Sequence, residues 1–462
     1  MSDSAKLIRG SVAGHLVTQT APMVIGVAAI MSIGLVDAYF IGQLGAEQLA
    51  AIAFIFPIGV ALASLGVGVM VGINSVVARA LGEGNDRVAA QLANTGVALS
   101  AILGTAMAVA LYLLLDPLFR LMNAEERLLP IIRDYMQPFT IGFAVQMLIM
   151  GLNGVLRGQG EARKTSYVSV ACAAVNWVLD PILITGAFGF EGFGIAGAAY
   201  ASIAGWVVGV ALALWLIRQT PLRLDPAFLR AEGMGHSIKG ILKVAGPASF
   251  SNAINPIGLS VLTALVAIEG QDAVAGFGAA GRVQSFAVVP LLALSGAIGA
   301  IVGQNWGAKK FDRARTASVY AFGFCIAFGL VIAAILALQG EWFAQFFTDS
   351  APVVDQFARY LQIAAWGYAG YGLLIVGNGI LNGVGHAGWA LAQSFARVFL
   401  VMLPVAWLAR GAYGADAVYA AELLANLIGG ALAVAIVWWL FRRVSEKGPS
   451  TGIAEQVGAP GA

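Results

Sequence analysis

Long runs of apolar residues follow one another along almost the whole 462-residue chain, and they constrain its fold more than any other feature. A helix needs about 20 predominantly apolar residues to cross the ~30 Å hydrocarbon core of a bilayer. Twelve runs are long enough: 14–38, 50–76, 92–115, 132–156, 166–186, 194–217, 244–268, 276–302, 317–339, 358–381, 389–409 and 415–441. The sequence therefore predicts an integral membrane protein.

Composition and pattern together indicate the fold class. Only 11% of the residues are charged and 59% are hydrophobic, whereas an average soluble domain has roughly 25% charged residues. The bilayer admits only helices or closed barrels, and the runs lack the every-second-residue alternation of barrel strands. We predict an all-α integral membrane protein with twelve transmembrane helices in two pseudosymmetric six-helix lobes.

The basic residues predict the topology of these helices, because cytoplasmic loops carry an excess of Lys and Arg. With the N-terminus inside, nineteen Lys and Arg residues fall in cytoplasmic segments and five in external ones. This indicates a multi-pass protein of a bacterial-type inner (plasma) membrane, in contact with membrane lipids, with both termini in the cytoplasm. No cleavable signal peptide precedes the first run, residues 445–462 are expected to be disordered, and we expect a monomer.

The chain aligns with itself when it is shifted by 225 residues. This shift superposes Gly82 on Gly307 and Asn153 on Asn378. The repeat predicts an N-terminal lobe at residues 1–220, a cytoplasmic linker at 221–243 and a C-terminal lobe at 244–444. Both halves begin on the same side of the membrane, and transporters built from such repeats bind substrate near the midplane between the lobes. Alternating access by rocking lobes follows.

Carboxylates inside the first half point to a cation pathway. Asp37 lies within the first apolar run, where a charge costs roughly 2.5–3.5 kcal/mol on insertion scales and by default marks an ion or substrate path. Asn176 and Asp180 are spaced i, i+4, so they share one face of the fifth helix. The 225-residue shift places Leu262 opposite Asp37, so the acidic chemistry is confined to one half.

If Asp37 and Asp180 meet, the pair is a proton-loading site, because two like charges in a poorly hydrated place do not both ionise readily. Na⁺ is possible at the same Asp37, Asp180 and Asn176 cluster, and no other metal site is expected. The alternative is that each carboxylate sits at a helix end and reaches the external interface.

Other polar and flexible side chains could belong to the same cavity. Asn153 and Ser202 would face it, or else hydrogen-bond between helices. Pro22 would be a hinge in the first helix, or a passive kink. Further cavity or substrate candidates are Met31, Tyr39, Met150 and Glu422, each with packing or lipid contact as the alternative. Arg282 and Arg397 lie near predicted helix ends and are expected to snorkel to the interface.

Several functional classes are excluded. The chain has no GxxxxGK[ST] motif, which excludes a self-contained pump of the P-loop type. Its three histidines are scattered, and Cys172 and Cys325 lie in apolar runs without metal-ligand spacing. We therefore expect no enzyme, no cofactor and no nucleic-acid partner.

Five motifs together resemble the multidrug and toxic compound extrusion (MATE) family. They are Pro22 with Asp37, VARALGEGNDRVAA, NGVLRGQGEARKTS, NWVLDPILI and GIAGAAYAS. The resemblance spans essentially the whole chain. It implies two six-helix lobes around a central cleft, and secondary active export of organic cations or amphiphilic drugs in exchange for H⁺ or Na⁺.

Within that family, the chain is most similar to the DinF-like branch, which places its key acids in the N-terminal lobe. The resemblance puts Asp37, Asn153, Asn176 and Asp180 at the cation site and Pro22 where helix one bends. The NorM-like branch has acids in helices seven and ten. Here helix seven has none before its terminal Glu269 and helix ten has none at all, which favours H⁺. The alternative is a lipid-linked oligosaccharide flippase of the same superfamily, which would need a strongly cationic cavity.

Overall fold

The computed structural model describes residues 5–187, 191–225, 227–228 and 233–447, and within these ranges it contains helices and no strand. The first half comprises η1 (Lys6–Ile8), α1 (Val12–Leu44), α2 (Ala46–Gly82), α3 (Asp86–Leu121), α4 (Leu129–Gly158), α5 (Ala162–Asp180), the π-helical η2 (Pro181–Thr185) and α6 (Ile195–Ile217). The second half comprises α7 (Met234–Ala267), α8 (Gln271–Ala287), α9 (Val289–Gly307), α10 (Phe311–Leu338), α11 (Gly340–Ala344), α12 (Ala351–Ala364), η4 (Ala365–Gly367), α13 (Tyr368–Gly383), α14 (Ala387–Phe395), the π-helical η5 (Ala396–Met402), α15 (Leu403–Tyr413) and α16 (Ala415–Lys447).

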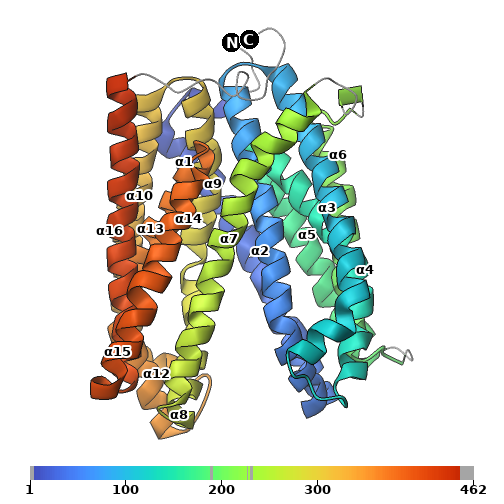
Figure 1. Ribbon diagram of the computed structural model, residues 1–462, viewed down its shortest axis with the longest axis vertical. Helices are drawn as coiled ribbons and strands as arrows, with labels where there is room; N and C mark the ends of the chain where they lie inside the picture. Colours follow the sequence, from blue (N-terminus) through green and yellow to red (C-terminus); the bar gives the residue numbers. More distant parts are fainter. Residues whose placement is uncertain (1–4, 188–190, 226, 229–232, 448–462) are drawn as a thin grey trace.

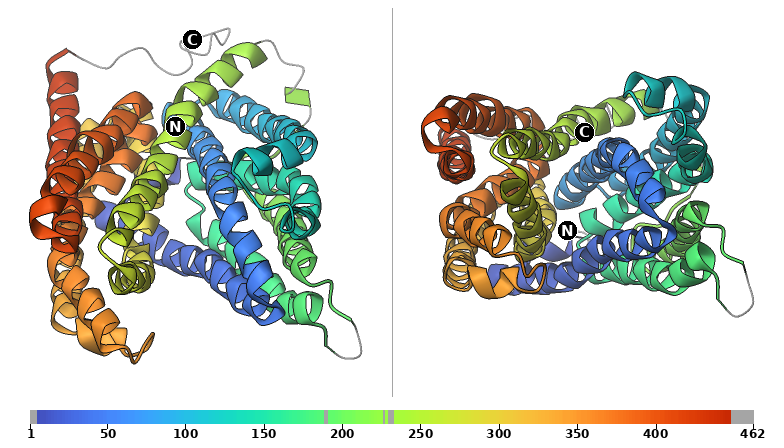
Figure 2. Two further views of the ribbon diagram at one scale, coloured as in Figure 1. Left: turned by 60° about the horizontal axis from the view of Figure 1, so that its bottom comes forward. Right: turned by 90° about the horizontal axis from the view of Figure 1, so that it is seen from below.

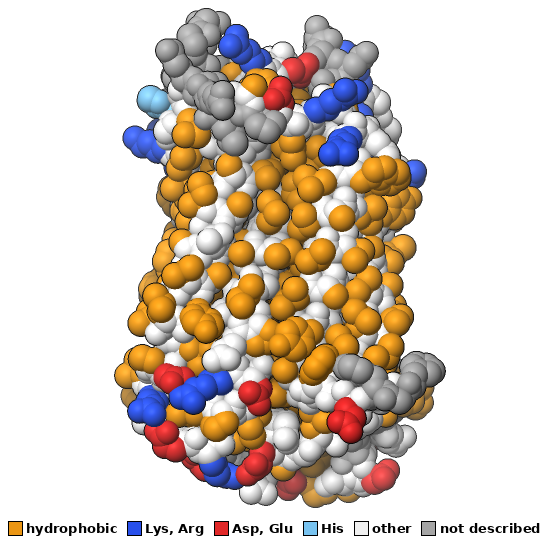
Figure 3. Space-filling model, turned by 90° about the vertical axis from the view of Figure 1, so that its right-hand side faces the viewer, with side chains coloured by type: hydrophobic (Ala, Val, Ile, Leu, Met, Phe, Trp, Pro, Cys, Tyr) orange, Lys and Arg blue, Asp and Glu red, His pale blue; other side chains and the backbone are white. Residues whose placement is uncertain are grey.

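Twelve helical spans in the described part of the chain are long and apolar enough to cross a membrane, which confirms the predicted fold class. Hydrophobic side chains cover the middle of the face in Figure 3, and the Lys, Arg, Asp and Glu side chains on that face gather at its two ends. Water is absent from a hydrocarbon core, so this belt marks the surface that lipid chains contact.

The predicted boundaries differ from the observed ones where helices continue beyond the apolar run or break within it. α7 begins at Met234, so the predicted linker at 221–243 is shorter, and α16 continues to Lys447 into the tail expected to be disordered. Residues 448–462 of that tail lie outside the described part of the chain. The predicted span 276–302 is two helices, which separate at Val288, just before Pro290 at the start of α9. Proline lacks an amide hydrogen and favours the first turn of a helix.

The two halves form two lobes (Figures 1 and 2). Each half packs mainly within itself, while α2 packs on α7, and α1 and α2 both pack on α9 across the boundary. The lobes lie close together at the end where α1 begins and α16 ends, and they diverge toward the opposite end (Figure 1). The molecule is therefore held together at one end.

Two glycines allow the lobes to touch at the closed end. A Cβ atom on Gly82 would overlap the carbonyl oxygen of Gln304, and one on Gly307 would overlap that of Arg79. These two contacts are related by the 225-residue repeat, since Gly82 corresponds to Gly307 and Arg79 to Gln304. Small residues let helix backbones approach closely in membranes, so the repeat supplies both halves of this seal.

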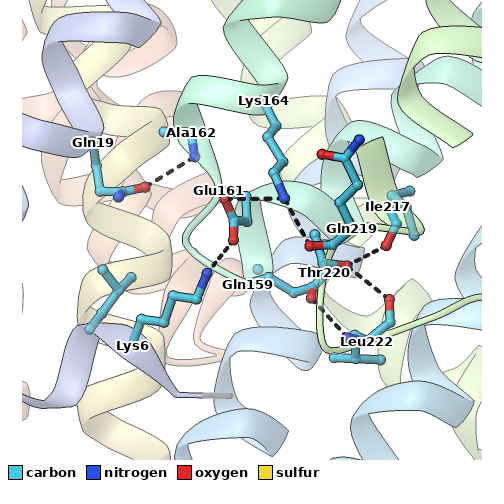
Figure 4. A network of polar contacts seen from close by, with 12 residues as sticks. Lys6, Gln19, Gln159, Glu161, Ala162, Lys164, Ile217, Gln219, Thr220 and Leu222 are labelled. Carbon is cyan, nitrogen blue, oxygen red and sulfur yellow. Dashed lines mark hydrogen bonds and ion pairs between the residues drawn. The ribbon is translucent and has the colours of Figure 1, made fainter. Parts of the chain in front are cut away.

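The N-terminal segment reinforces the same end. The amide of Leu7 donates to Gln304 Oε1 (3.1 Å), and Asn305 Nδ2 donates to the carbonyl oxygen of Leu7 (3.1 Å). Lys6 forms an ion pair with Glu161 of the N-terminal lobe, and Glu161 Oε2 lies 3.8 Å from Lys164 Nζ (Figure 4). The segment thus contacts both lobes where they meet.

Candidate functional site

A cavity of about 870 Å³ lies between the two lobes. Its walls come from α1, α2, α4, α5 and α6 on one side and from α7, α8, α9, α13 and the α14–α16 region on the other. Ligand-binding cavities typically measure roughly 300–1,000 Å³. Four charged residues line it: Asp37, Arg157, Arg397 and Glu422. The cavity is large enough for a drug-sized molecule. The charges of these four side chains determine the charge of the molecule that can bind there.

The carboxyl groups of Asp37 and Asp180 meet in the N-terminal lobe. Asp37 lines the cavity from α1, and Asp180 is fully buried behind it at the end of α5. The Asp37 side chain lies next to both Asp180 and Asn176. Two carboxyl groups hydrogen-bond to each other only when one carries a proton. Neighbouring carboxyl groups of this kind are a candidate for holding a cation or sharing a proton.

Few donors satisfy this pair. Asp37 Oδ1 and both carboxyl oxygens of Asp180 are buried and have no hydrogen-bond partner among the described residues. Buried carboxyl oxygens without donors are costly unless a proton or a cation joins them. Asn176 Oδ1 is also buried and has no hydrogen-bond partner among the described residues.

The neighbouring amide and hydroxyl groups extend the polar wall. Asn176 Nδ2 donates to Ser202 Oγ of α6 over a long 3.4 Å, which turns the Asn176 oxygen away from Ser202. Asn153, on α4, lines the cavity and is 7% exposed, with a free buried Oδ1. Ser202 lines the cavity as well. All four predicted coupling residues therefore lie in one lobe, with Asp180 as the innermost.

An aromatic wall stands beside the acids, and the sequence analysis missed it. Tyr135 stacks on Phe139 with ring centroids 5.6 Å apart, and Phe139 meets the edge of Trp206 at 5.8 Å. All three rings line the cavity. The i, i+4 spacing of Tyr135 and Phe139 was the available signal. Aromatic faces attract cations, so this wall complements the acidic pair.

The remaining candidates divide into those that reach the cavity and those that do not. Met31 and Met150 line it. Tyr39 does not: it is 65% exposed and packs edge-on against Phe40, on the outer surface of α1. Pro22 lies inside α1, which continues as one helix from Val12 to Leu44.

Glu422 is bound within a network in the C-terminal lobe. Its Oε1 accepts a hydrogen bond from Gln284 Nε2 (2.8 Å) and its Oε2 from the Tyr360 hydroxyl (2.9 Å). The side chain is 4% exposed. Both oxygens thus have donors, in contrast to the acids of the other lobe.

Arg397 is buried in the wall of the cavity, which corrects the expectation that it snorkels to the interface. Its span runs from Ala387 to Tyr413, so Arg397 lies well inside it, and the side chain is 4% exposed. Nη1 donates to Asn255 Oδ1 (2.7 Å) and Nε to Asn426 Oδ1 (2.9 Å). Arg282, by contrast, is exposed on α8 and does not line the cavity.

Two segments of the chain match one family model. The model, described as MatE, matches residues 22–182 and again 247–408. The matched segments begin 225 residues apart, the offset of the internal repeat. The chain belongs to the MATE family. The resemblance inferred from the motifs is confirmed, and the chain is a multi-pass membrane protein of a family of multidrug transporters.

Relatives of this MATE transporter match along most of their length. It is 30% identical over 451 residues to a protein named FAD transporter from Shewanella oneidensis, covering 98% of this chain and 99% of that protein. It is 25% identical to the probable multidrug resistance protein YoeA of Bacillus subtilis, covering 82% and 83%. A crystal structure of the Vibrio cholerae MATE transporter VcmN is 28% identical, with a TM-score of 0.89 over 97% of this chain and 99% of that one.

No group of three or more His, Cys, Asp or Glu side chains in the described ranges is arranged to hold a metal ion. A cation at Asp37 would have two carboxylates and the amide oxygen of Asn176 around it. Na⁺ is a hard ion that, like other hard cations, prefers oxygen ligands. The site of this MATE transporter offers oxygen atoms only, which suits either a proton or a small hard ion.

Proposed function

We propose that this chain is a cation-coupled exporter of organic cations and amphiphilic drugs that works by alternating access. One observation supports the proposal most strongly: Asp37 and Asn176 line the cavity with Asp180 beside them, while the second lobe has Leu262 at the position equivalent to Asp37. A cation that binds the carboxyl pair makes this wall of the cavity less negative. The wall then attracts a cationic cargo less strongly, so binding of the ion favours release of the cargo.

The orientation follows from the basic residues. With both termini in the cytoplasm of a bacterial plasma membrane, the closed end faces inward and the divergent end faces outward. The structure then corresponds to an outward-facing state. In this state cargo leaves and an external cation reaches Asp37. Rocking of the lobes would then open the seal at Gly82 and Gly307.

The coupling ion is proposed to be H⁺. The acids of the DinF-like branch lie in the N-terminal lobe, as they do here. A carboxyl pair whose oxygens lack donors is completed by a single proton, whereas Na⁺ needs several ligands in a defined geometry. The oxygen of Asn176 leaves Na⁺ as the alternative, and the experiment below separates the two.

A second cargo class is a flavin nucleotide. The relative from Shewanella oneidensis is named an FAD transporter, and a buried arginine lines this cavity opposite the acids. The lipid-linked oligosaccharide flippase has less support. Its pyrophosphate would call for a strongly cationic cavity, whereas this cavity is lined by two acidic and two basic side chains.

The decisive experiment is transport by purified protein in proteoliposomes, with pH and sodium gradients imposed separately and ethidium as cargo. We expect a pH gradient to drive ethidium movement and Asp37→Asn to reduce the rate by about tenfold or more, equivalent to about 1.4 kcal/mol or more. Asp134→Asn is the matched control, since Asp134 is exposed on α4 in the same lobe.

Coupled transport at the wild-type rate by Asp37→Asn would rule out its role. Movement driven by a sodium gradient alone, at equal pH on both sides, would replace H⁺ by Na⁺. Equal loss of transport in both variants would show a general effect of charge removal and would contradict the assignment to the carboxyl pair.

A further inference from the structure

Arg397 is a buried charge that no carboxylate neutralises directly. Only 4% of its surface is exposed, and no acidic side chain in the described part of the chain forms an ion pair with it. Asn255 and Asn426 accept hydrogen bonds from it through neutral amide oxygens. Burying a guanidinium without a counter-ion is costly. A buried arginine without a counter-ion is therefore a candidate for binding an anion.

The arginine has unused donors on the side of the cavity. A guanidinium has five N–H donors, and the protein uses one on Nε and one on Nη1. Nη2 makes no hydrogen bond to a described residue, and it is not among the polar atoms that are sealed from solvent without a partner. Because Arg397 lines the cavity, these donors remain available there.

The surroundings hold the guanidinium in one orientation. Asn255 Nδ2 donates to the Tyr371 hydroxyl (3.4 Å), so its oxygen is directed at Arg397. The guanidinium carbon lies 5.1 Å from the centroid of the Tyr371 ring. On α16, Gly429 leaves room for the arginine stem, because a Cβ atom there would lie 3.2 Å from Arg397 Cγ and Cδ. A preorganised fork of this kind recognises planar or tetrahedral oxyanions.

Glu422 is an acidic group that bears electrostatically on this charge. It sits one helical turn before Asn426, lies beyond ion-pair distance of Arg397, and already accepts donors from Gln284 and Tyr360 on its two oxygens. It therefore offsets the arginine's charge only from a distance. The open edge of the guanidinium keeps its attraction for an anion.

We propose that Arg397, with Asn255 and Tyr371, forms a subsite for the phosphate or carboxylate group of an amphiphilic cargo. The proposal rests on the proposed transport function and specifies the cargo class at the same cavity. The rest of the cargo lies across the cavity against Tyr135, Phe139 and Trp206. Cargo with an aromatic part and an oxyanion fits both walls.

The test is a binding experiment that does not depend on coupling. Riboflavin, FMN and FAD share one ring system and differ in phosphate, and flavin fluorescence reports their binding to the purified protein. We expect wild-type protein to bind FMN and FAD about tenfold or more tightly than riboflavin, the size of one charged bidentate contact. Arg397→Gln should abolish this preference and leave riboflavin affinity within about twofold.

Three further variants locate the subsite. Arg397→Lys should keep part of the preference, since lysine supplies charge without the fork. Arg282→Gln, at the exposed arginine of α8, should bind like wild type. Arg157→Gln removes the other arginine of the cavity wall; if it, and not Arg397→Gln, abolishes the preference, the assignment to Arg397 is overturned. Equal binding of all three flavins by wild-type protein overturns the subsite itself.

A lipid headgroup carries the same chemistry as a soluble phosphate, so short-chain phosphatidylglycerol is added as a competitor. If this lipid does not displace bound FMN, or displaces it more weakly than FAD does, the result supports a soluble cargo. If the lipid competes with FMN more strongly than FAD does, and this competition disappears in Arg397→Gln, the soluble cargo is overturned. The oxyanion is then assigned to a lipid. If wild-type protein prefers FMN and FAD to riboflavin but shows no pH-driven transport of ethidium, the transport proposal is rejected and the subsite is retained.

Discussion

The inner faces of the two lobes share a scaffold and differ in which of their equivalent positions carry a charged side chain. Asn153 and Asn378 are equivalent under the 225-residue repeat, and both line the cavity. In contrast, Asp37 stands opposite Leu262 in the alignment, and Arg397 stands opposite Cys172; these four residues also line the cavity. The positions that both lobes share serve the symmetric packing. The positions that differ carry the chemistry. At these two pairs the acid belongs to the first lobe and the base to the second, while Arg157 adds a base to the first wall and Glu422 an acid to the second.

The difference assigns separate tasks to the two walls. A carboxyl pair without donors can take up and release a cation. The two oxygens of Glu422, by contrast, lie within hydrogen-bonding distance of Gln284 Nε2 and the Tyr360 hydroxyl. An arginine with free donors can hold an anion throughout the cycle. We infer that the N-terminal lobe couples the ion and the C-terminal lobe selects the cargo. Substitutions that exchange equivalent residues of the two walls, or that remove a polar group from one wall, test this division.

The largest effect is expected from exchanging the equivalent residues Asp37 and Leu262. Leu262 is fully buried, so Leu262→Asp places a charge in an apolar position at a cost of roughly 2.5–3.5 kcal/mol. Asp37→Leu removes a half-buried carboxyl group whose Oδ1 is buried without a hydrogen-bond partner, so it should fold at least as well as wild type. Thermal unfolding of both purified variants, followed by size-exclusion fluorescence, measures the contrast.

Leu262→Ala is the control for loss of packing, since it removes volume without adding charge. The comparison fails if Leu262→Asp is as stable as wild type, because the second lobe would then tolerate the chemistry of the first. It also fails if Asp37→Leu unfolds, since the carboxylate would then be structural.

The sequence was sufficient to predict the helices because the bilayer imposes a length and a composition on each one. It also singled out Asp37 and Asp180, because a carboxylate in an apolar run stands out, and Asn176 by its i, i+4 spacing from Asp180; the structure brings the three together. The break at Val288 was not predicted, since Pro290 lies in a continuous apolar run that reads as one span. A membrane helix is apolar all round, so its sequence does not show which face a cavity occupies.

Arg397 shows the same limitation most clearly. The predicted span 389–409 placed it near a helix end, but the observed span from Ala387 to Tyr413 is longer and contains the π-helical η5 at Arg397. A π turn changes the direction of the side chains that follow it. Asn255 and Asn426, which orient the guanidinium, come from α7 and α16, and only the tertiary structure brings them together.

A smaller effect is expected when the acid of the second lobe is neutralised. In Glu422→Gln the amide can still accept from one neighbour and donate to the other, so the network with Gln284 and Tyr360 persists in altered form. We expect pH-driven ethidium transport to change by less than about threefold, well below the effect of Asp37→Asn. Transport lost in Glu422→Gln to the same extent would show that both lobes couple the ion, and the division between the walls would be abandoned.

The smallest expected effect belongs to Ser202→Ala. Its hydroxyl accepts from Asn176 Nδ2 over 3.4 Å, a long bond that orients the Asn176 oxygen without touching the carboxyl pair. A neutral hydrogen bond contributes about 0.5–1.5 kcal/mol, so the apparent affinity for the coupling cation should fall by about two- to tenfold, while the maximal transport rate stays near that of wild type. Ethidium transport measured across a series of external pH values separates these two parameters. Ser285→Ala is the matched control, because Ser285 lines the cavity from α8 and its hydroxyl bonds only to the helix backbone. An equal shift in both variants would trace the effect to cavity polarity, whereas a shift confined to Ser202→Ala would locate cation binding at the amide of Asn176.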